Sequence, residues 1–120
     1  MTERNEWVTV ARLGAIDVVR VAGEVDTANA PAIGAEAAAH TRDATAVLLD
    51  LTAVPFIDSA GVRLLDTMLG TFAERGTAVR LVVPATGAVR LALTLCAFPD
   101  ELLETDLAAA AASLQEPPRA

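Results

Sequence analysis

The chain has 120 residues, of which 53% are hydrophobic and only 3% aromatic, and this suits one domain with an aliphatic core. Nine basic residues against sixteen acidic ones give a formal net charge of −7, which argues against nucleic-acid binding and against a polybasic membrane-surface role. A single cysteine and a single histidine exclude a disulfide framework and a Cys/His metal cluster.

The amino-terminal residues 1–6 are polar and precede no long apolar segment, so we do not expect a signal peptide. No apolar run reaches the length of about eighteen residues that suggests a membrane-spanning helix, so no direct membrane insertion is expected. We expect a cytoplasmic protein with one domain at residues 7–115. Residues 1–6 and residues 116–120 are expected to be flexible ends.

Two short segments rich in β-branched residues, Trp7–Leu13 and Ile16–Ala22, are separated by Gly14. This pattern predicts a β-hairpin, because glycine allows a tight turn between two strands. Trp7 is expected to pack against the sheet or to cover its edge. The acidic loop Gly23–Thr27 follows the hairpin.

An alanine-rich helix is predicted from Pro31, in its first turn, to about Arg42. Either Thr27 or Asn29 is a candidate for its N-cap. Val47–Leu51 is a nearly continuous apolar run, which is typical of a central strand that is covered on both faces.

A second helix is predicted from about Ser59 to Arg75, because its apolar residues fall at helical spacing, and Gly76 is its expected stop. The next strand is Val79–Val83. A third helix is predicted from about Ala88 to Ala97. A short strand or turn at Glu101–Glu104 comes next, followed by a last helix to about Gln115 that Asp106 can cap.

Strands and helices therefore alternate after the hairpin, which predicts an α/β fold with right-handed crossovers. The amino-terminal hairpin should make the sheet mixed. We expect a single-domain mixed β-sheet of four to five strands, with about four α-helices packed against it.

The segment Asp58-Ser59-Ala60-Gly61 lies between the most buried strand and the best amphipathic helix of this prediction. Loops at the carboxyl ends of strands are where open α/β sheets bind ligands and partners. The start of the helix favours negative charge, so a phosphate on Ser59 would be tolerated and Ser59 is a candidate phosphoacceptor. A phosphate would add about −1.5 to −2 charges there. Ser and Asp before a helix are most often only caps, and a capping residue can also be a phosphoacceptor.

Asp26 is the second candidate, with a solvated loop acid or a helix cap as the plainer interpretation. Two strands that end at the same edge of a sheet would bring Asp26 close to Ser59. Gly61 is expected to serve backbone geometry or close packing.

Nothing in the sequence favours an enzyme. The Gly-x-Ser-x-Gly motif is absent around Ser59, and no glycine-rich phosphate-binding loop occurs. His40 is expected at a solvated helix end, and Cys96 is expected to be an inert core thiol. We therefore expect no catalytic residue, no cofactor and no metal site.

Together, in this order and spacing, these segments resemble the STAS domain, and most of all the stand-alone bacterial anti-sigma factor antagonists of that family. Gly23-Glu24-Val25-Asp26 matches the family's Gly-Glu-(Leu/Val/Ile)-Asp segment. Val47–Leu51, followed by Phe56–Gly61, matches its central strand and its Asp-Ser-(Ser/Thr/Ala)-Gly loop.

The resemblance implies that an anti-sigma factor with serine kinase activity binds the protein and phosphorylates Ser59. The unphosphorylated protein would bind the anti-sigma factor and so release the sigma factor for transcription, as in a stress response. Phosphorylation would abolish this binding, and a phosphatase would restore it. Asp26 would support phosphorylation and partner docking, and Asp58, Ala60 and Gly61 match the rest of the loop.

Two departures from the family pattern stand out. Ala60 removes a second hydroxyl that many members carry, and Leu95–Pro99 replaces the usual turn before the last strand, which we expect to affect partner choice. The alternative function is a non-switching STAS module, as a subunit of a lipid-transport ATPase or of a stress-signalling complex.

Overall fold

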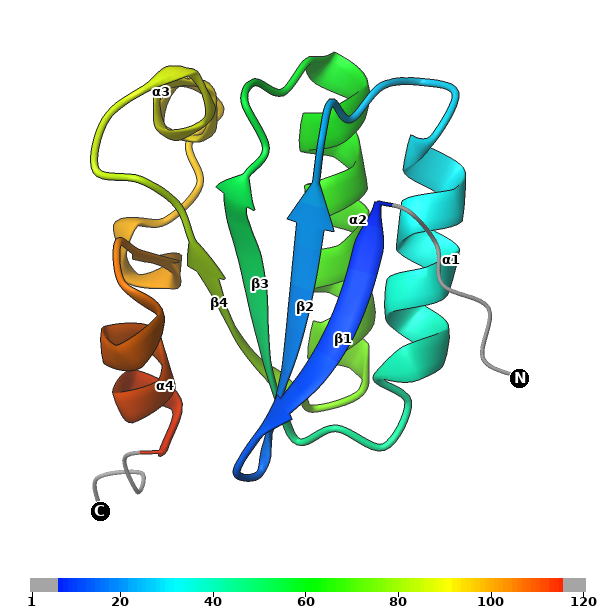
Figure 1. Cartoon of the computed structure of the whole chain (residues 1–120), viewed down its shortest axis with the longest axis vertical. Helices are drawn as coiled ribbons and strands as arrows, with labels where there is room; N and C mark the ends of the chain where they lie inside the picture. The colour runs from blue at the N-terminus through cyan, green and yellow to red at the C-terminus, as the bar shows by residue number, and fades with distance from the viewer. Residues whose placement is uncertain (1–6, 116–120) are drawn as a thin grey trace.

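Five strands form one mixed sheet in the order β1-β2-β3-β4-β5 in the computed structural model, which describes residues 7–115 (Figure 1). β1 is antiparallel to β2, and all the other pairs are parallel. The predicted α/β fold with a mixed sheet and about four helices is confirmed. The strands are β1 (Val8–Leu13), β2 (Ile16–Ala22), β3 (Ala46–Ala53), β4 (Ala78–Val82) and β5 (Leu103–Glu104), and the helices are α1 (Ala30–His40), α2 (Ser59–Glu74), α3 (Ala88–Leu95), α4 (Leu107–Gln115) and the 3₁₀ turn Asp100–Leu102.

The predicted hairpin is present, with Gly14 at φ +64° in the turn between β1 and β2. Such a positive φ strains residues with a side chain, so glycine suits this position. Trp7 is half-buried and packs against the core, as expected, and its carbonyl accepts a hydrogen bond of 2.9 Å from the Ala22 N–H.

The strand order explains how the helices are layered. Each parallel crossover moves one strand further in the same direction, and right-handed crossovers then place α1, α2 and α3 on one face. Their buried residues join one apolar cluster with β2, β3 and β4, and this cluster contains Ile33, Phe72 and Leu93. The opposite face is left to α4, whose Ala110 and Ala111 pack on Leu48 and Val82.

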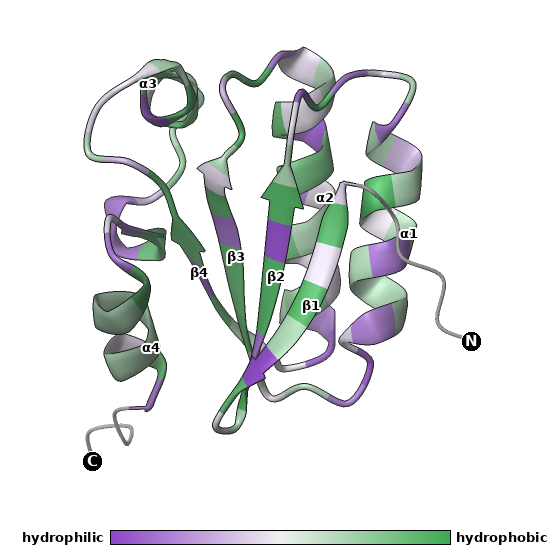
Figure 2. Cartoon of the chain, viewed as in Figure 1, coloured by the Kyte–Doolittle hydropathy of each residue, from purple (hydrophilic) through white to green (hydrophobic). Residues whose placement is uncertain are grey.

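β3 is the central strand that the apolar run predicts. Its residues Val47, Leu48 and Leu49 are fully buried because the layers of helices cover both faces. Figure 2 shows β2 and β3 as mostly hydrophobic, with separate hydrophilic bands. The loops that carry Asp26 and Ser59 emerge at the carboxyl ends of β2 and β3.

The helices end within two residues of their predicted ends. α2 begins at Ser59 and buries Leu65, Met68 and Phe72, which are apolar positions at helical spacing. Gly76, with φ +70°, follows the end of α2 as expected. The N–H of Thr77 donates to the Phe72 carbonyl at 2.9 Å.

The prediction that Cys96 is a core thiol is wrong, because this residue is exposed. α3 ends at Leu95, and Ala97 then takes a left-handed conformation at φ +61°. That reversal turns Phe98, rather than Cys96, toward the apolar cluster, and the Phe98 N–H donates to the Leu93 carbonyl.

The predictions for residues 1–6 and 116–120 lie outside the described residues. In the described part of the chain, no helix has both the length and the apolar character needed to cross a membrane.

Candidate functional site

Two loops meet at the end of the sheet where β2 and β3 finish (Figure 1). Val25, in the loop before α1, forms an isolated parallel bridge with Ile57, in the loop before α2. The Gly23 N–H also donates to the Ala53 carbonyl at 3.1 Å. Since Asp26 follows Val25 and Asp58 follows Ile57, the structure brings together the two segments that the sequence singles out.

Asp26 organises the first of these loops. Its carboxylate Oδ1 accepts hydrogen bonds from the N–H groups of Ala28 at 2.9 Å and of Asn29 at 3.0 Å. Its own carbonyl accepts from the Ala30 N–H at 2.9 Å. Asp26 is therefore an exposed acid that closes the turn before α1, and this matches the plainer interpretation of the residue as a solvated loop acid rather than a helix cap.

Asn29 is buried and connects two parts of the same loop through side-chain hydrogen bonds. It is only 6% exposed, its Oδ1 accepts from the Asp26 N–H at 2.8 Å, and its Nδ2 donates to the Glu24 carbonyl at 2.8 Å. Its side chain makes no cap hydrogen bond to α1, although it occupies the N-cap position. The sequence suggested Thr27 or Asn29 as a cap but gave no sign of this loop tie.

Asp58 caps α2, as anticipated for an acid before a helix. Its backbone is extended, and its Oδ1 accepts from the Gly61 N–H at 3.0 Å. Its carbonyl accepts from the Val62 N–H at 3.0 Å. The carboxylate is thus held against the first turn, where it satisfies an N–H group that has no partner within the helix.

Ser59 is the first residue of α2 and is exposed. Its hydroxyl makes no hydrogen bond within residues 7–115, so the capping role next to it falls to Asp58 alone. A side chain of this kind, at the start of a rigid helix and open to solvent, can be reached by a modifying enzyme. Ala60 behind it is half-buried.

Gly61 is buried and serves close packing, as expected. A Cβ atom there would collide with Ile57 Cγ1 and would lie 3.4 Å from Val25 Cγ1. The absence of a side chain therefore lets α2 start directly against the bridge between the two loops. For this reason Gly61 allows the first turn of α2, which begins at Ser59, to lie against the Val25–Ile57 bridge.

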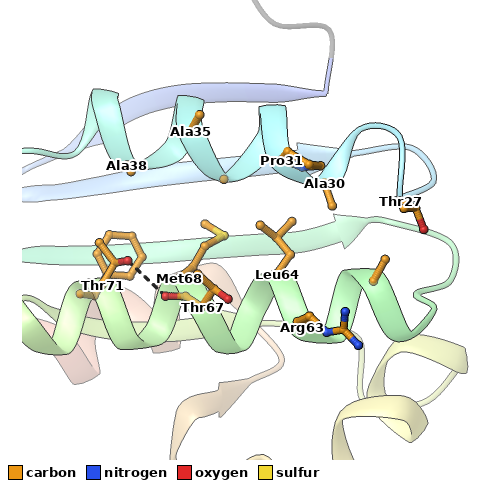
Figure 3. A pocket seen from close by; sticks show the side chains of 13 residues that line it. Thr27, Ala30, Pro31, Ala35, Ala38, Arg63, Leu64, Thr67, Met68 and Thr71 are labelled. Atoms are coloured by element: carbon orange, nitrogen blue, oxygen red, sulfur yellow. Dashed lines mark hydrogen bonds between the residues drawn. The ribbon is translucent and has the colours of Figure 1, made fainter.

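A groove of about 400 Å³ runs between α1 and α2 and reaches the site at one end (Figure 3). Small residues of α1 form one side, and Gly34 leaves so little room that a Cβ atom there would lie 2.9 Å from Leu64 Cδ1. Thr27, Ala60 and Arg63 line the end nearest to Ser59. The sequence did not reveal this groove, because its two walls come from different helices.

Apolar side chains are also exposed around this end of the molecule. Phe56, two residues before Asp58, is 46% exposed. On α3, Leu91 is 59% exposed and Leu95 is 76% exposed. Leu95 opens the Leu95–Pro99 segment that departs from the family pattern.

The other residues that the sequence analysis weighed lie away from these loops. His40 is exposed at the end of α1, as predicted, and its Nε2 lies 3.0 Å from Glu36 Oε2. Within residues 7–115, no group of three or more His, Cys, Asp or Glu side chains is placed to hold a metal ion.

The model of the STAS domain family matches residues 8–112 of the chain. A solved anti-sigma factor antagonist from Mycobacterium paratuberculosis is 26% identical, covering 91% of this chain and 93% of that one, with a TM-score of 0.82. The anti-sigma factor antagonist SpoIIAA in its unphosphorylated form is 17% identical, covering 90% and 96%, with a TM-score of 0.75.

A part of the murine anion transporter Slc26a9 has the same fold. It is 18% identical, covers 88% of this chain and 18% of the transporter, and has a TM-score of 0.75. No curated protein matches the chain.

Proposed function

The chain belongs to the STAS domain family, and we propose that it is an anti-sigma factor antagonist that a serine-kinase anti-sigma factor switches off by phosphorylating Ser59. The 26% identical structural relative, which spans nearly the whole chain, is itself an anti-sigma factor antagonist. The observation that carries the proposal is the exposed Ser59 hydroxyl, free of partners within residues 7–115, beside the Asp26 loop.

The protein is the substrate of this reaction and not its catalyst. The kinase would transfer the γ-phosphoryl group of ATP to Ser59 Oγ, with ADP leaving and the hydroxyl proton passing to a base of the kinase. Asp26 and Asn29 would hold the neighbouring loop in the shape that the kinase recognises. A phosphoserine phosphatase would reverse the modification by hydrolysis.

The unphosphorylated surface presents a neutral hydroxyl at the centre of the proposed interface. Phosphorylation adds about −1.5 to −2 charges close to Asp26 and Asp58, in a protein that is already acidic. An interface that closes over this group must remove it from water, which costs several kcal/mol when the partner supplies no matching cation. A loss of about 2.8 kcal/mol corresponds to a hundredfold weaker binding.

Labelling with ATP and each serine-kinase anti-sigma factor encoded in the same genome tests the proposal. We expect the intact mass to rise by about 80 Da, the mass of one phosphoryl group. The gain should be lost in Ser59→Ala and kept in Ser113→Ala, because Ser113 is the only other serine of the chain.

Labelling that persists in Ser59→Ala would contradict the proposal. So would tight binding of the same kinase to both the phosphorylated and the unphosphorylated protein. If no kinase labels the chain, the switch is refuted, and the alternative becomes the better hypothesis: a non-switching STAS module that acts as a subunit of a lipid-transport ATPase or of a stress-signalling complex.

A further inference from the structure

Arg63 is an arginine on α2 that has no partner among the described residues 7–115. All nine basic residues of the chain are arginines. Arg75 and Arg90 donate to backbone carbonyls, and Arg12 lies 3.6 Å from Asp17. Arg63 is exposed and makes no hydrogen bond or ion pair within residues 7–115. Its guanidinium is therefore available to a charge that the unmodified protein does not carry.

Ser59 and Arg63 are four residues apart on the same helix. Side chains at this spacing lie on one face, with Cβ atoms about 5–6 Å apart. Helical side chains also lean toward the amino terminus of their helix, so the longer Arg63 side chain extends toward Ser59. Figure 3 shows its guanidinium directed along α2 toward that end.

The charged residues in the two loops next to Ser59 are acidic, and Arg63 is the arginine within α2, Ser59–Glu74. Asp58, next to Ser59, keeps its carboxylate on the Gly61 N–H and adds like-charge repulsion. Glu24 and Asp26 add further negative charge to the facing loop. Among residues 7–115, Arg63 is also the only charged residue that lines the groove between α1 and α2.

We propose that Arg63 binds the phosphate of phosphorylated Ser59 within the same molecule, an inference that rests on Ser59 being the modified residue. An arginine fork can donate two hydrogen bonds to phosphate oxygens, and the pair strengthens as the phosphate becomes doubly charged. The modification then acts on the groove as well as on the loop, because it draws the groove's charged residue to Ser59.

The second ionisation of the phosphate, with a pKa of about 6, reports this pair directly. We would install phosphoserine at position 59 during translation, so that no kinase is needed, and titrate the phosphorus-31 resonance. In Arg63→Gln the pKa should rise by about 0.3 pH units or more relative to the parent protein, because the dianion loses its partner. In Arg63→Lys, which keeps a positive charge at this position, the pKa of the phosphate should lie close to that of the parent protein.

Arg42→Gln is the matched control. Arg42 is an exposed arginine without a partner within residues 7–115, and it lies just after α1, toward the opposite end of the sheet. We expect its titration to match that of the parent protein. Equal pKa values in the parent and in Arg63→Gln would overturn the pairing, and so would an equal rise in Arg42→Gln, which would indicate only a change in net charge.

The two proposals fail in different ways. Absence of labelling by every kinase would refute the proposed switch and would leave the titration result untouched. Labelling at Ser59 together with an unchanged pKa in Arg63→Gln would refute the intramolecular pair alone. Far-ultraviolet circular dichroism of the three variants checks that each keeps its helices.

Discussion

Val25 and Ile57 form an isolated parallel bridge beyond the ends of β2 and β3, and Gly61 packs directly against both of them. This contact sets the spacing between the loop of Asp26 and the first turn of α2. The candidate site is therefore held by buried apolar groups, although the residues that would act in it are polar and exposed.

Gly61→Ala should destabilise the protein, because its Cβ atom would collide with Ile57. Overpacking of this kind typically costs about 1–3 kcal/mol. Urea unfolding measures the change in the free energy of unfolding. Gly70→Ala is the control in the same helix, where a Cβ atom has open space and should stabilise by about 0.5–1 kcal/mol. A Gly61→Ala protein as stable as the parent would contradict the packing role.

Asn29→Ala should loosen the first loop, since it removes the hydrogen bonds with the Asp26 N–H and the Glu24 carbonyl. A typical hydrogen bond contributes about 0.5–1.5 kcal/mol, so the loss of both should lower the free energy of unfolding by about 1–3 kcal/mol. Hydrogen exchange of the Asp26 amide should become faster than in the parent protein. The exposed Thr27, replaced by alanine, serves as the control and should leave this exchange rate unchanged. Equal exchange rates of the Asp26 amide in the parent, Asn29→Ala and Thr27→Ala would show that the Asn29 hydrogen bonds do not hold this loop.

Phe56→Ala should weaken binding to the anti-sigma factor, because this exposed ring precedes the Asp58–Ser59 turn. Truncation of one of the few residues that dominate an interface costs more than about 1 kcal/mol, so we expect binding to weaken about tenfold if Phe56 is such a residue. Isothermal titration calorimetry measures the affinity. Leu13→Ala is the matched control, because Leu13 is 43% exposed but lies at the hairpin, away from the site. Equal losses in both variants would place the interface elsewhere.

Cys96 should react with a thiol reagent in the native protein, because the residue is exposed. We expect one thiol per chain to be titrated without denaturant, at a rate within about tenfold of that in urea, since no unfolding step is required. A reaction that needs denaturant would show that the thiol is buried after all.

The sequence and the structure agree wherever a local signal decides the outcome. The apolar run of β3, the glycine turns at Gly14 and Gly76 and the helical spacing in α2 all predict their elements. The cap at Asp58 is also a local signal, since it requires only an acid before the first turn.

Features that join distant parts of the chain could not be derived in this way. The Val25–Ile57 bridge depends on the register of two strands, and the tie through Asn29 depends on the shape of a loop. The buried position predicted for Cys96 assumes that α3 continues beyond Leu95. The helix ends there, and no sequence signal marks the positive φ of Ala97.

The sheet order has a consequence for synthesis on the ribosome. Because β1 to β5 stand side by side in chain order, no strand must insert between two strands that have already paired. Nascent domains can gain structure from the amino terminus as they emerge. The loops that carry Asp26 and Ser59 join β2, β3 and α2, so both can be in place before β5 has been translated. A nascent chain that has left the ribosome as far as the end of α2 is therefore the shortest one in which we expect the two loops to be paired.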